Sequence, residues 1–399
     1  MRVAILGRYI PSQCGIAEYT DFLVKAVKSV DRSIDLIVLG NRDTGVESPN
    51  VETIDGVIVR RVFVSASNDY SEVLDSLKDV RPELLHIQHE YSFFPRSVRF
   101  LEFLDKARSY CKKIVITMHT VVKPMGIVKA VQGLTTFSEG AKEDFEIVMF
   151  QRQLGELCDA IFVHSTIQHY ELWMQGVDPL KIHIVPHGTL LNPYVSHSKS
   201  RLVEELGLDI DPNKLVILLP GFVRPDKGLD ILVKVFKLVT PKIDAIFIMG
   251  GAPQGAEADR IVDFMHHVSS LHRSVVFIDR YLTREELLKL LALSDIVALP
   301  YRESPGLIGV SGALHLAMGS FKPMVCTRIP KLAEYCEIVP ELCARPEDPV
   351  DFASKLIDLV ENLESYRKEL EPVWKYAVKT SWNSIASTHI KLWKQLIES

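Results

Sequence analysis

The sequence predicts an α/β protein made of two doubly wound, parallel-sheet domains that face each other across a central cleft. Short apolar runs rich in β-branched residues alternate with longer helix-period segments along the whole chain, a pattern typical of βαβ units. Glycine-containing loops follow several of these runs, where open sheets of this class bind ligands. At 399 residues the chain is longer than an average domain, so we expect two, each with its own core.

The expected strands are apolar runs that end in polar or glycine-containing loops. In the first half they are 3–6, 35–39, 57–63, 84–88, 114–118, 160–164 and 182–186. In the second half they are 215–221, 245–250, 274–278, 295–300 and 323–326. Thr283 and Glu286 have the spacing of a capping box and mark the start of a helix between two of these strands.

A polar, irregular stretch near residues 192–214 separates the two halves. We therefore assign residues 1–192 to an N-terminal domain and 193–378 to a C-terminal domain. Residues 379–399 have apolar side chains at helical spacing and form a final helix that needs a surface to cover.

Composition excludes several classes of protein. The chain has 47% hydrophobic and 24% charged residues, the profile of a soluble globular protein, and its net charge of −5 argues against a nucleic-acid partner. No apolar run is long enough to span a bilayer, and residue 1 leads directly into a strand pattern, so we expect a cytoplasmic protein. The six cysteines lack a Cys-x-x-Cys pair, and we expect all of them to be buried free thiols.

Two cations follow the first strand of the second half. Arg224 and Lys227 lie in a turn framed by Gly221 and Gly228, just before a helix. Cations fixed beside a nucleoside diphosphate favour its departure, because they stabilise the negative charge that grows on it. The alternative is a solvated turn in which one cation pairs with Asp226.

A carboxylate and a sharp turn follow the strand at 295–300. Glu303 precedes a Ser-Pro-Gly turn, which we expect to leave the N–H groups of Gly306, Leu307 and Ile308 facing an anion as the chain opens into the next helix. The carboxylate of Glu303 would then bind sugar hydroxyl groups. The simpler alternative is that Glu303 only complements the dipole of the helix.

The first half offers fewer candidates. His119 ends the strand at 114–118, and we expect it to contact substrate. The basic cluster Lys106, Arg108, Lys112 and Lys113 allows peripheral contact with an anionic membrane at the inner face, although a solvated helix end is the simpler interpretation.

Several motifs are missing. Neither half has a dinucleotide-binding Gly-x-Gly-x-x-Gly after its first strand, and there is no Walker A sequence. Asp209 and Asp211 form an Asp-x-Asp, but they lie in a turn ahead of the strand, where turn chemistry explains them better than a metal. The histidines do not have metal-ligand spacing either, so we expect no metal and no cofactor.

In its order of motifs the chain resembles GT-B glycosyltransferases of the family 4 type, also called glycosyl transferases group 1. The matching pieces are Gly15 with the residues after it, His119, His187-Gly188, Gly221 to Gly228, Glu303 to Gly306, Gly319 to Pro323 and Trp382. The resemblance implies a retaining, metal-independent hexosyl transfer from a UDP- or GDP-sugar to an acceptor hydroxyl, in which the leaving phosphate helps to deprotonate the acceptor. It places the donor on the C-terminal domain, with Gly15 near its phosphates, and the acceptor on the N-terminal domain. The last helix would pack back on the N-terminal domain.

Two positions depart from the family pattern. Phe222 occupies the place of the usual arginine, so we transfer that role to Arg224. Ser311 stands where the second Glu of a Glu-x7-Glu motif belongs, so the donor's ribose would meet a shorter hydroxyl. Two alternatives therefore stay open: another reaction on the same scaffold, such as sugar-nucleotide epimerisation or phosphorolysis, and a non-catalytic sugar-nucleotide binding protein. The acceptor is a sugar, a lipid-linked molecule or another small molecule.

Overall fold

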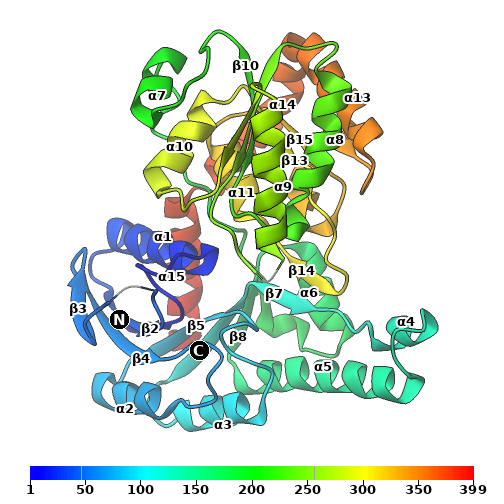
Figure 1. The fold of residues 1–399 in the computed structure, drawn as a ribbon. Helices are drawn as coiled ribbons and strands as arrows, with labels where there is room; N and C mark the ends of the chain where they lie inside the picture. Colours follow the sequence, from blue (N-terminus) through cyan, green and yellow to red (C-terminus); the bar gives the residue numbers. More distant parts are fainter. Residues whose placement is uncertain (46, 256) are drawn as a thin grey trace. The chain divides into compact units, whose positions relative to one another are not determined.

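The computed structural model describes residues 1–45, 47–255 and 257–399 and divides them into two compact units. The first unit comprises Met1–Gly188, Pro305–Val310 and Trp382–Ser399, and the second comprises Thr189–Ser304 and Ser311–Ser381. Both have helices packed on a largely parallel sheet, which confirms the predicted α/β class (Figure 1). None of the helices described is long and apolar enough to cross a membrane.

The first unit contains an eight-stranded sheet with the order β3-β4-β2-β1-β5-β6-β8-β9. All neighbouring strands are parallel except β3, which runs antiparallel to β4. The strands are β1 (Arg2–Leu6), β2 (Asp35–Asn41), β3 (Val51–Ile54), β4 (Val57–Phe63), β5 (Leu84–His89), β6 (Lys113–Met118), β8 (Ala160–Val163) and β9 (Ile182–Ile184). Strands β1, β5, β6 and β8 are buried along almost their whole length, as expected for a sheet covered on both faces.

Helices cover both faces of this sheet (Figure 1). The helices of this unit are α1 (Gly15–Val30), α2 (Ser71–Val80), α3 (Val98–Ala107), α4 (Gly126–Val131), α5 (Phe137–Leu157), α6 (Thr166–Met174) and α15 (Trp382–Glu398), with the 3-10 turn η1 (Pro179–Lys181). Helix α4 packs on α5 and not on the sheet. The last helix, α15, packs against α1. Its Trp382 ring lies 4.9 Å from that of Tyr19 and 5.3 Å from that of Phe22, and Trp393 is fully buried.

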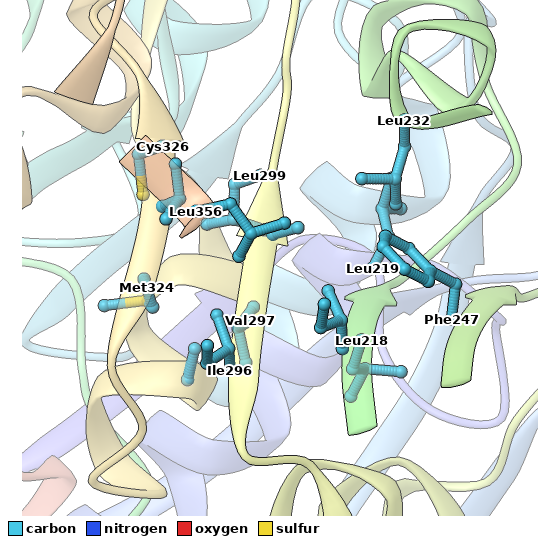
Figure 2. Packing of buried hydrophobic residues seen from close by; sticks show 14 of the residues in the cluster. Leu218, Leu219, Leu232, Phe247, Ile296, Val297, Leu299, Met324, Cys326 and Leu356 are labelled. Atoms are coloured by element: carbon cyan, nitrogen blue, oxygen red, sulfur yellow. The ribbon is translucent and has the colours of Figure 1, made fainter. Parts of the chain in front are cut away.

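The second unit contains a six-stranded parallel sheet with the order β12-β11-β10-β13-β15-β16. The strands are β10 (Leu215–Pro220), β11 (Ala245–Gly250), β12 (Val275–Ile278), β13 (Ile296–Leu299), β15 (Met324–Thr327) and β16 (Cys343–Ala344). Figure 2 shows side chains of β10, β11, β13 and β15 packed with Leu232 and Leu356 in the core of this unit.

The helices of the second unit are α7 (Lys199–Leu206), α8 (Leu229–Val239), α9 (Ala258–Leu271), α10 (Arg284–Leu293), α11 (Gly312–Gly319), α12 (Ala333–Cys336), α13 (Pro349–Glu361) and α14 (Leu363–Lys379), with 3-10 turns η2 (Pro225–Lys227), η3 (Pro330–Leu332) and η4 (Pro340–Leu342). They connect its strands, except that α7 precedes β10 and α13 and α14 follow the last strand. The predicted capping box is confirmed at the start of α10, where Thr283 and Glu286 bond to each other's backbone N–H groups.

Two expectations from the sequence are wrong. Cys336 and Cys343 form a disulfide, because the chain turns back after α12 and brings their Cα atoms to 5.7 Å. The cysteines Cys14, Cys111, Cys158 and Cys326 are buried free thiols, as expected. The chain also does not open into a helix directly after Gly306. It forms a short strand, β14 (Leu307–Gly309), which pairs antiparallel with β7 (Thr120–Val122) in the first unit.

Candidate functional site

The strand order of the second unit marks a position for a ligand. Strand β10 lies between β11 and β13, so the chain winds outward in opposite directions from the β10/β13 pair. In open α/β sheets, ligands bind at such a switch point, beyond the carboxyl ends of the strands. The loops there are the two that the sequence singled out, with Arg224 and Lys227 after β10 and Glu303 after β13.

Two glycines shape the loop after β10. Gly221 has φ +112° and Gly228 has φ +68°, both in the region that disfavours other residues. A Cβ atom on Gly228 would lie 2.0 Å from the carbonyl oxygen of Pro300, so only glycine allows the loop to approach the end of β13 so closely. Between them, η2 turns the chain and presents Lys227 directly before α8.

The ammonium group of Lys227 has no anionic partner of its own. Its Nζ atom lies 3.9 Å from the centre of the Tyr301 ring, and it makes no hydrogen bond or ion pair with the described residues. Burial lowers the pKa of Lys227 to about 8, an effect that the carboxylate of Asp226 opposes and the guanidinium of Arg224 reinforces. Lys227 is thus a desolvated cation suited to an anionic ligand.

Arg224 lies on the same loop but is already paired. Its Nε donates to Asp226 Oδ1 at 2.7 Å, which is the pairing that the simpler interpretation of the sequence predicts. The other carboxylate oxygen, Oδ2, accepts from Lys331 Nζ at 3.3 Å. Burial alone would raise the pKa of Asp226, but Lys227, Lys331 and Arg224 outweigh it and hold the pKa below its usual value. Asp226 therefore remains ionised beside three cations.

Arg302 joins the two loops at the switch point. Its guanidinium binds both carboxylate oxygens of Asp230, at 2.9 and 2.8 Å, and donates to the carbonyl of Pro225 at 3.0 Å. Its backbone N–H donates to the carbonyl of Asp226 at 2.9 Å. A bidentate guanidinium is rigid, so Arg302 fixes the Lys227 loop relative to the start of the Glu303 loop.

The carboxylate of Glu303 is exposed and makes no hydrogen bond or ion pair with the residues that the structure describes. It is thus available to a ligand, as a residue that binds sugar hydroxyls must be. Its contact with a donor sugar stays a prediction.

The segment after Glu303 belongs to the first unit. Gly306 has φ +78°, and its carbonyl accepts from the backbone N–H of Lys123 at 2.8 Å. Leu307 and Ile308 lie opposite Val122 and Val121 in the β14–β7 ladder. In an antiparallel pair, alternate N–H groups of a strand point toward the partner strand and away from it. The pairing with β7 therefore does not engage every amide of this segment, and the contact of these amides with an anion stays a prediction.

Ser311 has a structural role that the sequence did not reveal. It is buried, and its side chain accepts from the N–H of Leu314 at 3.3 Å as the N-cap of α11. Serine is among the preferred N-cap residues. Capping accounts for this hydroxyl without any contact with a donor ribose.

In the first unit, Gly15 opens α1 directly after the loop that follows β1. A Cβ atom added there would meet nothing within 4 Å, so its backbone faces open space. The strand order places the switch point of this sheet between β1 and β5, and α1 follows β1, so Gly15 begins a helix beside the switch point.

His119 follows β6 and is buried, with both ring nitrogens occupied. Nε2 lies 3.0 Å from Gln88 Oε1, and Nδ1 lies 3.2 Å from His164 Nε2. Burial, reinforced by His164 and His187, lowers the pKa of His119 well below its ordinary value, so its imidazole is neutral. Neither nitrogen is therefore free to exchange a proton with a substrate in this arrangement. Contact of His119 with substrate stays a prediction.

The basic cluster considered for membrane contact is partly neutralised. Arg108 lies 3.7 Å from Asp159, and Lys112 lies 3.7 Å from Glu83. No group of three or more His, Cys, Asp or Glu residues among those described could hold a metal ion.

Sequence reasoning missed three residues of the second unit's site: Tyr301, Arg302 and Lys331. Tyr301 and Arg302 directly precede Glu303, so their position after a buried strand was a usable signal. Lys331 lies about a hundred residues from the Lys227 loop, and only the adjacency of β13 and β15 brings the ends of these segments together.

Comparison with known proteins agrees with this architecture. Residues 214–362 match the family model "Glycosyl transferases group 1". D-inositol 3-phosphate glycosyltransferase of Mycobacterium sp. strain KMS is 24% identical over 307 residues, which cover 72% of this chain and 66% of the relative, just under two thirds of its length. The enzyme of the same name from Mycolicibacterium vanbaalenii is 23% identical, covering 85% of this chain and 76% of the relative.

Solved structures match the fold over nearly the whole chain. Sucrose-phosphate synthase from Thermosynechococcus elongatus has a TM-score of 0.74 at 17% identity, covering 100% of this chain and 99% of that one. Anabaena Alr3699/HepE, solved in complex with UDP-glucose, has a TM-score of 0.71 at 15% identity and covers 99% and 100%. At these identities the likeness concerns the fold.

Proposed function

We propose that the chain is a glycosyltransferase of the group 1 type, whose family model residues 214–362 match. In this proposal it transfers a hexosyl group from a nucleoside diphosphate sugar to an acceptor hydroxyl, with retention of configuration and without a metal ion. The second unit would bind the donor and the first unit the acceptor. UDP is the favoured nucleotide, because the related Anabaena structure was solved with UDP-glucose, and GDP is the alternative.

The observation that carries this proposal is the unpaired ammonium of Lys227 at the β10/β13 switch point. A nucleoside diphosphate leaves with two to three negative charges, and a cation held in a partly desolvated loop stabilises that charge more strongly than water does. Arg224 and Asp226 form an ion pair beside it and orient the loop. Such an arrangement supplies the positive charge that a divalent metal would otherwise provide.

The proposed reaction breaks the bond between the sugar's anomeric carbon and the diphosphate oxygen. Lys227 and Arg224 stabilise the leaving group, and the exposed carboxylate of Glu303 holds the sugar through its hydroxyls. The acceptor hydroxyl attacks from the face that the diphosphate leaves and gives its proton to a phosphate oxygen. This proton route needs no base from the protein, which agrees with the absence of a free nitrogen on His119.

The names of the relatives support a small, polar acceptor. The curated relatives are named as D-inositol 3-phosphate glycosyltransferases, and one structural relative is a sucrose-phosphate synthase. We propose a polyol or sugar acceptor, with a phosphorylated one as the first to be tested.

A thermal-shift screen with UDP, GDP, ADP and their hexose conjugates tests the proposal. Ligands that bind the folded protein raise its Tm, and at a hundred times Kd the stabilisation is about 2.7 kcal/mol. We expect one nucleotide series to raise the Tm of the wild type but not that of Lys227→Ala. The control is Lys237→Ala, which removes an exposed lysine from α8 and should respond as the wild type does. A flat response of the wild type to every nucleotide would contradict the proposal.

Turnover then separates transfer from the alternatives. With donor and acceptor present, Lys227→Ala should lose well over tenfold in kcat/KM, since a charge-assisted contact of this kind is worth about 2–4 kcal/mol. Incubation with donor alone should release nucleotide slowly. An epimerised donor would indicate a different reaction, and binding with no transfer to any acceptor would indicate a binding protein.

A further inference from the structure

Lys331 brings a third cation to the Lys227 loop from a distant part of the second unit. It lies in η3, in the connection that follows β15, the strand next to β13 in the sheet. Its Nζ atom lies 3.3 Å from Asp226 Oδ2, and its side chain is 30% exposed. Lys331 can therefore reach both the loop and a ligand bound beside it.

The charges around Asp226 do not balance. Arg224 occupies Oδ1, Lys331 occupies Oδ2, and Lys227 lies beside them without a carboxylate of its own. Burial lowers the pKa of Lys331, the nearby charges of Lys227 and Arg224 lower it further, and Asp226 only partly opposes them. One carboxylate thus faces three cations, which leaves an excess of two positive charges.

A purely structural ion pair does not need this excess. Arg224 alone would neutralise Asp226 through a short contact of 2.7 Å, and adding Lys331 to the pair costs repulsion from two neighbouring cations. An anion with at least two charges removes that repulsion, because it supplies the missing counter-charge. The diphosphate of a donor has the required charge.

We propose that Lys331 is a third donor-binding cation, which contacts the diphosphate together with Lys227. This inference rests on the proposed function and adds to it a residue outside the two loops that the sequence identifies. It makes diphosphate affinity depend on η3 as well as on the loop after β10.

Isothermal titration calorimetry of UDP and inorganic pyrophosphate tests the inference. The variants are Lys331→Met, which keeps most of the apolar stem, Lys331→Arg, which keeps the charge, and Lys237→Ala as the surface control. We expect Lys331→Met to lower the affinity for both ligands at least tenfold. Lys331→Arg should keep the affinity within threefold of the wild-type value. If Lys331→Met does not fold, Lys331→Gln is measured against the same expectation.

The outcomes separate this inference from the function on which it rests. Wild-type affinity in Lys331→Met would overturn the role of Lys331 while leaving that of Lys227 intact. A lower Tm with unchanged ligand affinity would assign Lys331 a structural role only and would also overturn it. If the wild type binds neither ligand and no other nucleoside diphosphate, the proposed function itself fails.

Discussion

Donor affinity should fall as the pH rises through the pKa of Lys227. Burial lowers that pKa from 10.5 to about 8, so the free site loses a proton that the unfolded chain would keep until far higher pH. An anionic ligand binds the protonated form, and the apparent Kd therefore grows with the fraction of Lys227 that has lost its proton.

The magnitude follows from that pKa. At pH 7.5 about three quarters of Lys227 is protonated, and at pH 9.5 about 3% is, so the apparent Kd should rise about 25-fold, or about 1.9 kcal/mol. The second ionisation of a phosphate lies near pH 6, which leaves the ligand's charge constant above pH 7.5 or so. Lys331 also faces the site with a lowered pKa and adds to the fall.

Calorimetric titrations of the bound nucleoside diphosphate between pH 7.5 and 9.5 measure this effect. Lys227→Arg should give a much flatter profile, because a guanidinium stays protonated throughout this range. Binding to the wild type should also take up a proton, visible as heats that depend on the ionisation enthalpy of the buffer. A flat wild-type profile without proton uptake would refute the reasoning. The same pKa shift predicts how the stability of the unliganded protein depends on pH. Between about pH 8 and 10.5 the unfolded chain keeps the Lys227 proton that the folded chain has lost, so the free energy of unfolding should rise with pH.

Two further predictions concern stability. Ser311→Ala should lower the free energy of unfolding by about 1 kcal/mol, because it removes the N-cap of α11, and should leave donor affinity unchanged. Ser311→Asp should keep most of the stability, because aspartate also serves as an N-cap. Weaker donor binding by Ser311→Ala would instead support a ribose contact. Gly188→Ala should destabilise the first unit by about 1–3 kcal/mol, since its Cβ atom would lie 2.3 Å from the ring of Trp382, and an unchanged Tm in calorimetry would contradict this.

Most strands of the two large sheets could be predicted because their signal is local, whereas the edge strands β3 and β16 were not expected. Buried parallel strands are short apolar runs, and every run expected from the sequence is a strand within a few residues of the expected bounds. The ends of β10 and β13 could be recognised as candidate ligand sites for the same reason, since the glycines and charged residues of these loops follow each strand directly.

Pairing between distant segments could not be predicted. Strands β7 and β14 are only three residues long and pair across about 185 positions, which leaves no periodicity to detect. The sequence therefore did not show that Leu307 and Ile308 lie in a ladder with β7. The approach of Lys331 to Asp226 depends in the same way on strand neighbours that the sequence does not encode locally. The disulfide is different, because Cys336 and Cys343 are only seven residues apart and a turn of the chain brings them together.

Some roles depend on which partner a side chain finds. Arg224 and Lys227 are three residues apart and indistinguishable by type, yet one forms an ion pair with Asp226 and the other lies over an aromatic ring without a counter-ion. His119 is similar, because its position at a strand end is evident from the sequence, whereas the occupation of both its nitrogens is not.

A crystal structure of the protein with the nucleoside diphosphate selected by the thermal-shift screen would show directly whether Lys227 binds the donor. The diphosphate should lie beyond the carboxyl ends of β10 and β13, with a phosphate oxygen within about 3 Å of Lys227 Nζ, a usual distance for a charge-assisted hydrogen bond. A nucleotide bound elsewhere, or one whose phosphates do not contact Lys227, would contradict the account.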